Sequence, residues 1–452
     1  MTEHEQSAQR QATSGPPPAT AGPRNHAPAP PAGWPAPSRA PQPPVPPSPQ
    51  QSAPPSEPYQ PTHPSSPQAA VVEAPPDADR RATDPDGQRP GRPAGPLPPG
   101  IWRESVEGLL ALSVWTERVP HRGEDAEPFV AHHWAGGQGL LAVFDGSGGS
   151  GSASVWQAPD GTPRTGAWVG ARVARLATDC WFREVATGGE PAVPESLREY
   201  LQYFLAFAPQ RRSKIGGTMR RLLPTTLAAV HYRLRDTPVG QEVELQPLWA
   251  GDSRAYVLQP QLGLRVLTRD HTRESDALEL LRTDPPMTNL VSADREFEID
   301  SRRLACRLPC VLVAATDGFF GYVHTPADFE LLLLRTLHEA RHEEEWADLI
   351  RREVQAYTAD DASLAVLALG YRHFEDLRAR FTARLGEMTE RYVRTRPRGL
   401  DRLSEAGTAA GPSAQEDSAD LPARVRAWQE STWQEYRPGY ESHLPPAPEE
   451  HG

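Results

Sequence analysis

Short apolar runs rich in strand-forming residues recur between residues 101 and 372, separated by polar and glycine-containing turns. This pattern predicts strands at 110–116, 139–144, 226–232, 243–249, 253–258, 264–267, 311–316 and 363–369. Apolar residues spaced three and four apart predict helices at 168–186, 195–207, 327–339 and 343–357. Because strands and helices do not alternate regularly, the order favours an antiparallel α+β fold over a doubly wound sheet. A turn at Gly251 and Asp252 predicts that 243–249 and 253–258 pair as a hairpin.

The pattern changes after residue 372. Apolar residues from Phe374 to Tyr392 lie on one helical face, which predicts an amphipathic extension over 373–396; packing on the core explains it better than partner binding. Residues 397–452 form an acidic tail that we expect to be largely disordered. Its aromatic stretch between Trp428 and Tyr440 leaves two alternatives open, a docking motif or a segment that folds back onto the domain.

The first 98 residues form a low-complexity arm dominated by Pro, Ala, Ser and Gln. Of the 51 prolines, 29 fall within residues 1–100. Such a composition cannot bury enough apolar surface to offset the entropy of ordering, so a disordered arm is predicted. A solvated tether is favoured over a ligand for a proline-binding domain.

Charge and cysteine content exclude several classes of protein. The net charge of −12 argues against nucleic acid or an anionic membrane as a partner. No apolar run approaches 18 residues and the N-terminus lacks a hydrophobic signal core, so we expect a cytoplasmic protein. Three cysteines, Cys180, Cys306 and Cys310, are too few for a disulfide framework and do not have zinc-knuckle spacing, which favours small buried side chains.

Acidic residues stand next to several of the apolar runs. Asp145 follows Leu140–Phe144 and precedes a Gly/Ser loop, whose small residues would let backbone groups approach a ligand closely. The other strand-end acids are Glu124, Asp125, Asp252, Asp317, Asp360 and Asp361. Holding such carboxylates near one another is costly without a cation, and oxygen ligands suit hard cations. The series therefore suggests a metal cluster.

The motifs occur in an order that resembles the PPM-type (class 2C) metal-dependent serine/threonine protein phosphatases in their bacterial form. The resemblance covers about residues 107–370. It rests on Glu-Asp-Ala (124–126), Phe-Asp-Gly-Ser-Gly-Gly (144–149), Thr-Thr-Leu (225–227), Gly-Asp-Ser-Arg-Ala-Tyr (251–256), Leu-Thr-Arg-Asp-His-Thr (267–272), Ala-Thr-Asp-Gly (315–318) and Asp-Asp-Ala-Ser-Leu (360–364).

The resemblance implies an α-β-β-α four-layer sandwich of two antiparallel sheets, with two Mn²⁺ or Mg²⁺ ions at one end. A hydroxide shared by the two ions would hydrolyse phosphoserine or phosphothreonine on a protein that a serine/threonine kinase has modified, which implies a role in signalling. The Pro-rich arm and the aromatic tail are candidate docking segments for such a partner.

Motif position also assigns the ligands. Asp145 would bridge both ions, the carbonyl of Gly146 would bind one, and Asp317 and Asp360 would hold the other. Asp361 more readily caps the turn. Glu124 and Asp125 would act in or just beyond the first coordination sphere through water, and Asp252 is either a further ligand or a structural turn residue.

Several positions depart from the family pattern. The arginine that holds the substrate phosphate is replaced by Pro120, with Arg122 and Arg118 as candidate substitutes. Further replacements are Gly123 for an asparagine, Ser147 or Ser150 for a loop histidine, Pro224 for a glycine and Gly321 for an acid, and 155–167 looks like an insertion.

These departures set two functions against each other. The retained carboxylates favour an active phosphatase. The missing arginine and histidine favour a pseudophosphatase that binds a phosphorylated partner without turnover. A scaffold acting through its arm and tail alone leaves the acidic series unexplained.

Overall fold

The computed structural model describes residues 100–189, 191–209, 220–238, 240–398, 400 and 420–447. The predicted Pro-rich arm (1–98) and residues 401–419 of the tail lie outside these ranges. Two antiparallel sheets make up the centre. The first runs in the order β1 (Ile101–Val106), β2 (Leu109–Thr116), β14 (Ala362–Leu369), β13 (Cys310–Ala315), β9 (Arg254–Gln259), β10 (Gly263–Val266).

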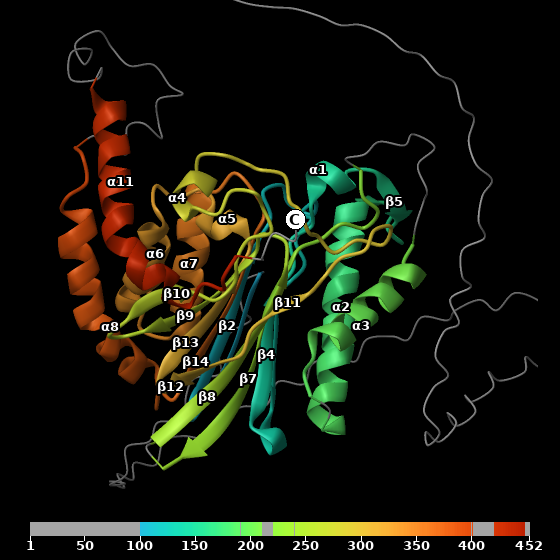
Figure 1. Ribbon diagram of the computed structural model, residues 1–452, viewed down its shortest axis with the longest axis horizontal. Coiled ribbons are helices and arrows are strands. Elements are labelled where there is room, and N and C mark those ends of the chain that lie inside the picture. Colours follow the sequence, from blue (N-terminus) through green and yellow to red (C-terminus); the bar gives the residue numbers. More distant parts are fainter. Residues whose placement is uncertain are drawn as a thin grey trace, which may run out of the picture. The chain divides into compact units, whose positions relative to one another are not determined.

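The second sheet lies against the first. Its order is β11 (Asp300–Ser301), β8 (Gly240–Ala250), β7 (Leu227–Thr237), β4 (Gln138–Val143), β3 (Phe129–His133), and β12 (Leu304–Arg307) also pairs with β8. Helices cover the outer face of each sheet (Figure 1). On the second sheet lie α2 (Gly166–Gly188) and α3 (Pro194–Phe207). On the first lie α6 (Pro326–Glu339), α7 (Glu343–Tyr357), α8 (Phe374–Met388) and α11 (Leu421–Tyr440). The predicted four-layer α-β-β-α sandwich is confirmed.

The continuous apolar runs follow from this layering. In β2, Leu110, Leu112 and Val114 face the helices, whereas Leu109 and Ala111 face the second sheet. β4 and β14 divide their side chains between two apolar layers in the same way. Because side chains alternate along a strand and both faces of each sheet are covered, apolar residues occupy most positions of these strands.

Short elements complete the described chain. They are α1 (Gly148–Gly151), α4 (Ala277–Leu280), α5 (Asp317–Phe320), the pair β5 (Ser154–Gln157) and β6 (Pro163–Thr165), a π-helical turn at Thr389–Val393, and 3₁₀ turns at Trp134–Gly136 and Glu441–His443. The apparent insertion at 155–167 thus forms the β5–β6 hairpin.

The predicted hairpin between 243–249 and 253–258 is wrong. β8 pairs with β7 in the second sheet, and β9 pairs with β10 and β13 in the first. The turn at Gly251 and Asp252 instead carries the chain from one sheet to the other. Gly251 has φ +102°, a conformation that side-chain-bearing residues rarely adopt, and a Cβ there would lie 2.8 Å from Thr226.

The described part of the tail corrects the expectation of a largely disordered segment. α11 packs against the first sheet's helical layer, and Trp433, Tyr436 and Tyr440 are buried in it. Aromatic residues spaced three and four apart form this buried face, which the acidic overall composition conceals. The fold-back alternative is therefore the one observed, and α8 likewise packs on the core.

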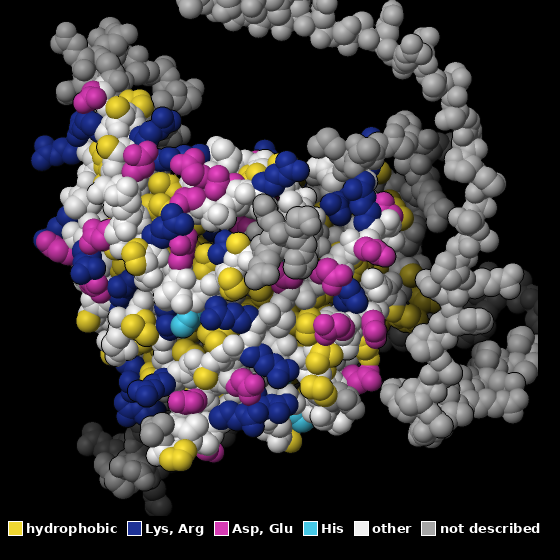
Figure 2. Space-filling model, viewed as in Figure 1, with side chains coloured by type: hydrophobic (Ala, Val, Ile, Leu, Met, Phe, Trp, Pro, Cys, Tyr) yellow, Lys and Arg dark blue, Asp and Glu magenta, His cyan; other side chains and the backbone are white. Residues whose placement is uncertain are grey.

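Two surface properties bear on partners. On the face shown in Figure 2, arginine and acidic side chains are interspersed with apolar ones. Among the helices of the described ranges, none has the length and apolar character needed to cross a bilayer.

Candidate metal and phosphate site

Strand register brings the acidic residues to one end of the sandwich. β13 ends at Ala315, which pairs with Leu364 of β14 and with Arg254 of β9. The residues just beyond these positions are Asp317, Asp360 and Asp252, so antiparallel pairing places three distant parts of the sequence side by side.

The main chain at Asp145 is fixed by two threonines. Its carbonyl accepts hydrogen bonds from the Thr226 N–H (2.8 Å) and the Thr225 hydroxyl (2.7 Å). The Thr226 hydroxyl also lies 2.6 Å from the hydroxyl of Ser253, beside Asp252. These contacts use backbone and hydroxyl groups, so they hold Asp145 and Asp252 in place without engaging either carboxylate.

Gly146 sits where a side chain would not fit. A Cβ there would lie 2.7 Å from the carbonyl oxygen of Glu124 and 2.9 Å from that of Ala167. The close approach keeps the Glu124 backbone against the Gly/Ser loop. Glu124 itself accepts a hydrogen bond from the Thr165 hydroxyl (2.5 Å), at the start of α2.

Asp361 was expected to cap its own turn, but its carboxylate binds a distant loop, and the Asp360 carboxylate accepts the hydrogen bond from the Asp361 N–H (2.8 Å) instead. The Asp361 carboxylate accepts hydrogen bonds from the backbone N–H groups of Arg118 (2.8 Å) and Glu124 (2.6 Å). The neighbouring Asp125 is buried and accepts a hydrogen bond from the Thr316 hydroxyl (3.0 Å). Both acids therefore stabilise the loop that carries Glu124.

The carboxylates repel one another. Burial raises the pKa of Asp145 well above its ordinary value, and the charges of Asp125 and Asp252 raise it further. Burial also raises the pKa of Asp317, and the negative charges of Asp145 and Asp252 raise it further. The pKa of Asp252 is raised to about 6, chiefly by burial. The buried Oδ1 of Asp252 has no hydrogen-bond partner among the described residues. A buried, unpartnered carboxylate oxygen is costly unless a cation or water satisfies it.

A pocket of about 360 Å³ opens onto this cluster, and Asp252, Asp317 and Asp360 line it. The lining also contains residues to which sequence reasoning gave no role, namely Asp270, Thr272, Asp284 and Tyr322. Asp270 lies within the motif at 267–272 that contributed to the family resemblance, so its motif position could have marked it as a candidate. Asp284 follows no apolar run, so nothing in the local pattern marks it.

The two candidate phosphate-binding arginines differ in position. Burial raises the pKa of Asp360, and the charge of Arg118 opposes that shift, so Arg118 lies near the pocket. The Tyr322 hydroxyl also donates to Asp360 at 3.5 Å. For Arg122, the contact found within the described ranges is a backbone hydrogen bond to Val119 (3.0 Å). The Arg118 backbone is held beside Asp361 by its N–H (2.8 Å), and neither arginine is among the residues that line the pocket.

The loop positions that lack a histidine are occupied by two serines in contact. The Ser147 and Ser150 hydroxyls lie 2.9 Å apart in the turn that contains α1. The two serines thus form a hydrogen bond with each other within the Gly/Ser loop that follows Asp145.

The donor set suits hard divalent cations, because it is made only of oxygen ligands, most of them on half-buried side chains, and includes an unpartnered one. In the part of the chain that the structure describes, no three acidic, histidine or cysteine side chains converge so as to hold one ion. The donors are therefore grouped by the fold without being in a coordinating arrangement.

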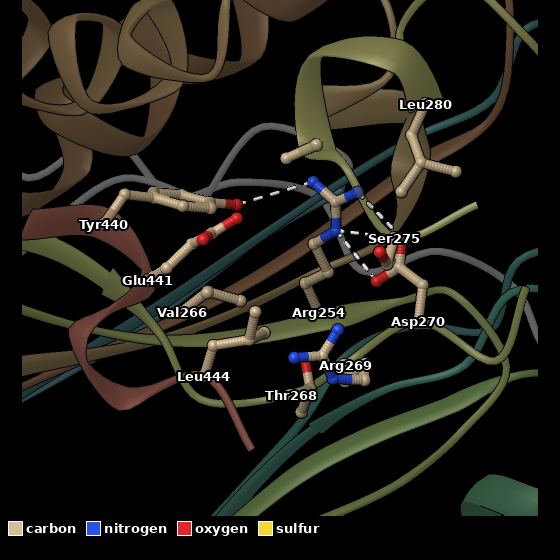
Figure 3. Close-up of a pocket in the computed structure, with 11 residues that line it drawn as sticks. Arg254, Val266, Thr268, Arg269, Asp270, Ser275, Leu280, Tyr440, Glu441 and Leu444 are labelled. Atoms are coloured by element: carbon tan, nitrogen blue, oxygen red, sulfur yellow. Dashed lines mark hydrogen bonds and ion pairs between the residues drawn. The ribbon is translucent and has the colours of Figure 1, made fainter. Parts of the chain in front are cut away.

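A buried ion pair connects the pocket to the C-terminal helix. Arg254 binds Asp270 through two nitrogens, at 2.9 and 2.7 Å, and its third nitrogen donates to the Tyr440 hydroxyl at 3.4 Å. Figure 3 shows the Arg254 guanidinium between Asp270 and Tyr440. Because Asp270 also lines the acidic pocket, α11 supports one of its walls.

No family model matches the sequence, and no curated protein matches it. Solved structures similar to this chain include a bacterial serine phosphatase (17% identity, TM-score 0.42, covering 57% of this chain and 97% of that one). Another is the Mycobacterium tuberculosis serine/threonine phosphatase PstP/Ppp (15% identity, TM-score 0.38, covering 58% of this chain and 99% of that one). A third is the PPM Ser-Thr phosphatase MsPP from Mycobacterium smegmatis (16% identity, TM-score 0.36, covering 57% of this chain and 98% of that one). The chain is thus similar to solved PPM-type phosphatases, the family that its motifs resemble.

Proposed function

We propose that this protein is a metal-dependent phosphatase that hydrolyses phosphoserine or phosphothreonine on proteins. The observation that carries the proposal is the carboxylate cluster, in which burial and the charge of Asp252 raise the pKa of both Asp145 and Asp317, while Asp252 itself keeps an unpartnered oxygen. Such repulsion opposes folding unless cations turn it into attraction.

Two divalent ions, Mn²⁺ or Mg²⁺, would be held by Asp145, the Gly146 carbonyl, Asp317 and Asp360. Glu124 and Asp125 would contribute through water, and the free Oδ1 of Asp252 makes it a further candidate ligand. The ions would supply charge neutralisation and an activated water for attack on phosphorus.

The chain's own residues have supporting roles. Thr225 and Thr226 fix the backbone of Asp145, and Asp361 fixes that of Glu124. Arg118, near Asp360, is the group placed to bind a substrate phosphate, in place of the arginine that Pro120 replaces. An arginine suits this role because its guanidinium is always charged and binds phosphate oxygens in pairs.

The substrate would be a protein phosphorylated by a serine/threonine kinase, and the setting a cytoplasmic signalling pathway. The alternative is a pseudophosphatase that binds such a protein without turnover. Pro120 and the Ser147–Ser150 contact favour that alternative, because neither position offers the family's arginine or histidine.

The test measures turnover of p-nitrophenyl phosphate and of a phosphothreonine peptide after EDTA treatment, with and without added Mn²⁺. We expect activity only with Mn²⁺, and loss of activity in Asp145→Asn. The matched control is Asp236→Asn, an exposed aspartate near the far end of β7 from Thr226, which should behave as wild type. Turnover without metal, or full activity in Asp145→Asn, would contradict the proposal. Mn²⁺ binding without turnover would identify the pseudophosphatase.

A further inference from the structure

A second, larger groove adjoins the acidic pocket. Its volume is about 1170 Å³, and its lining includes Trp249, Arg269, Arg273, Arg302 and the C-terminal segment Pro445–Ala447. Asp270 and Thr272 line both the groove and the acidic pocket, so the two are contiguous. The volume exceeds that of ordinary small-molecule pockets, about 300–1000 Å³. The size therefore suits a peptide better than a metabolite.

The three arginines of the groove have no carboxylate partner among the residues that the structure describes. Arg269 donates to the Pro445 carbonyl at 2.9 Å, and Arg302 donates to the His443 carbonyl at 3.1 Å. Arg273 is exposed. Within the described ranges, no ion pair to an acidic side chain is found for any of the three. Their guanidinium groups therefore retain donors that an incoming anion could use.

The acidic residues of the groove are already engaged. Asp270 is paired with Arg254 at 2.7 Å. Asp300 accepts from His271, whose Nε2 lies 3.1 Å from Oδ2; the Gly251 N–H donates to Nδ1, so Nε2 carries the proton. Arg254 neutralises Asp270, and Asp300 keeps its negative charge beside a neutral imidazole. Because three arginines line the groove with that one uncompensated carboxylate, the groove has a net positive charge on a protein whose net charge is −12.

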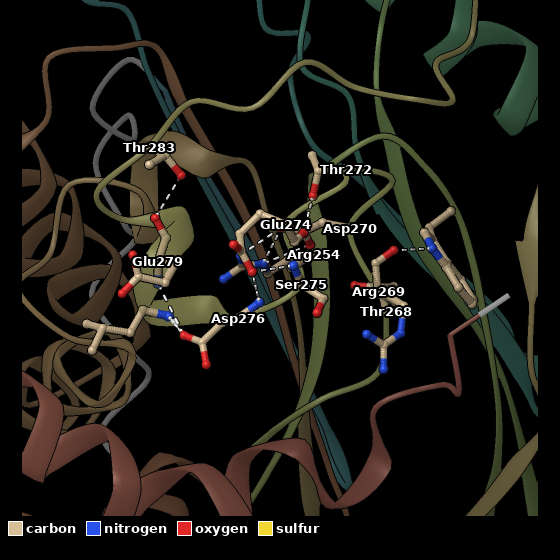
Figure 4. Close-up of polar contacts among 12 residues, drawn as sticks. Arg254, Thr268, Arg269, Asp270, Thr272, Glu274, Ser275, Asp276, Glu279 and Thr283 are labelled. Atoms are coloured by element: carbon tan, nitrogen blue, oxygen red, sulfur yellow. Dashed lines mark hydrogen bonds and ion pairs between the residues drawn. The ribbon is translucent and has the colours of Figure 1, made fainter. Parts of the chain in front are cut away.

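The backbone separates these charges. Arg269 and Asp270 are neighbours in sequence, yet Figure 4 shows Asp270 directed toward Arg254 and the Arg269 guanidinium directed away from that pair. The Trp249 indole N–H donates to the Arg269 carbonyl at 2.8 Å and holds the segment in this orientation. The Arg269 guanidinium is therefore separate from the Arg254–Asp270 pair and lines the groove with its own charge.

We propose that this arginine groove binds an acidic segment of the protein substrate next to its phosphorylated residue; the inference rests on the proposed function. Guanidinium groups bind carboxylate and phosphate oxygens in pairs. An acidic segment would be repelled by Asp252, Asp317 and Asp360, and the adjoining arginines give it a favourable site. The groove would thus select substrates in which acidic or additional phosphorylated residues flank the target.

Binding can be tested without turnover, which separates this proposal from the catalytic one. Fluorescein-labelled peptides are titrated against the full chain in EDTA and followed by anisotropy. One peptide carries glutamates around a threonine, a second carries glutamines instead, and a third carries phosphoserines. We expect both acidic peptides to bind at least about tenfold more tightly than the neutral one, because hydrogen bonds to charged groups contribute about 1.5–3 kcal/mol. Preference for the phosphoserine peptide over the glutamate peptide would assign the site to phosphate, and equal binding would assign it to anionic residues in general.

Arg273→Glu should weaken the binding of the acidic peptides about tenfold or more and leave the binding of the neutral peptide unchanged. Arg303→Glu is the matched control, because Arg303 is exposed, adjoins Arg302 and is not among the groove's lining residues. Arg269→Gln, which keeps a donor for the Pro445 carbonyl, provides a second test with less risk to the fold. Equal affinity for acidic and neutral peptides, or equal effects of Arg273→Glu and Arg303→Glu, would overturn the proposal.

The chain's own Glu449 and Glu450 follow Ala447 of the groove in sequence and are the competing occupant. If wild type binds no acidic peptide but a Glu449→Gln/Glu450→Gln variant does, the groove serves this segment and the substrate proposal is wrong. If the phosphatase is active, the ratio of kcat/KM for acidic over neutral phosphopeptides should also fall in Arg273→Glu.

Discussion

The carboxylate of Asp361 accepts a hydrogen bond of 2.6 Å from the backbone N–H of Glu124, across 237 residues of sequence. The same carboxylate accepts another from Arg118. These two bonds attach the loop that carries Glu124 and Asp125 to the start of β14. One acid of the pair 360–361 therefore organises the backbone, while the other faces the pocket.

Asp361→Asn should destabilise the metal-free protein by about 1–3 kcal/mol in urea unfolding, because the amide cannot replace both charge-assisted hydrogen bonds. The loss should appear although the change removes repulsion with Asp125. Asp360→Asn is the matched control and should leave the stability unchanged or higher. A wild-type midpoint for Asp361→Asn would show that Asp361 does not hold the loop.

A histidine in the second sheet makes stability depend on pH. Burial lowers the pKa of His231 to about 4, and the Arg233 charge adds to the effect. The unfolded chain, with a histidine pKa near 6.5, binds the proton first as pH falls, so stability is complete above about 6.5 and is lost progressively toward pH 4. His231 contributes roughly 3 kcal/mol to that loss.

The check is urea unfolding of wild type and His231→Gln at pH 7.5 and pH 4.5. The variant should lose less stability between these two values than wild type, since it lacks the titrating group. His338→Gln, at an exposed position of α6, should follow wild type. Parallel losses in wild type and His231→Gln would show that the imidazole is protonated at little cost in the folded protein.

Glu330 of α6 is the centre of a buried network that joins this helix to two other helices and to one strand of the first sheet. It pairs with Arg384 of α8 at 2.7 Å, accepts from the Tyr436 hydroxyl of α11 at 2.6 Å, and accepts from the Leu264 N–H of β10 at 3.1 Å. Arg384→Met should cost about 3–5 kcal/mol, because it leaves a buried charge without its cation.

The control for that change is Arg394→Met, which removes an exposed pair with Glu390 and should cost less than about 1 kcal/mol. Both variants are compared by thermal and urea unfolding. Equal, small effects would indicate that Glu330 is protonated or that α11 and α8 pack without this network.

The fold was largely predictable because both sheets are covered on both sides. Runs such as Leu364–Leu369 are apolar at every position and were assigned correctly. Which strands pair was harder, since pairing depends on distant contacts: the Gly251 turn looked like a hairpin but joins two sheets. The spacing of the aromatic residues in α11 could be read from the sequence. Their burial could not, because it depends on distant partners such as Glu330 and Arg254.

The site was predictable where acids follow apolar runs, as at Asp145 and Asp317. It was not predictable where a residue reaches the pocket only because of how the chain folds, without a local pattern in the sequence. Asp284 reaches the pocket from an irregular loop, and Tyr322 lies beyond the short helix α5. The choice between Arg118 and Arg122 also needed the loop conformation, because both lie in the same polar stretch.

The central claim is that Asp145, Asp317 and Asp360 form one binding site for divalent cations. Calorimetric titration of Mn²⁺ into wild type and Asp317→Asn tests it most directly, with unfolding of both proteins in EDTA as the accompanying readout. The account predicts that Asp317→Asn loses or greatly weakens Mn²⁺ binding while its metal-free stability is unchanged or higher, since a repelling charge is removed and the side-chain shape is kept. Wild-type Mn²⁺ affinity in Asp317→Asn would contradict it.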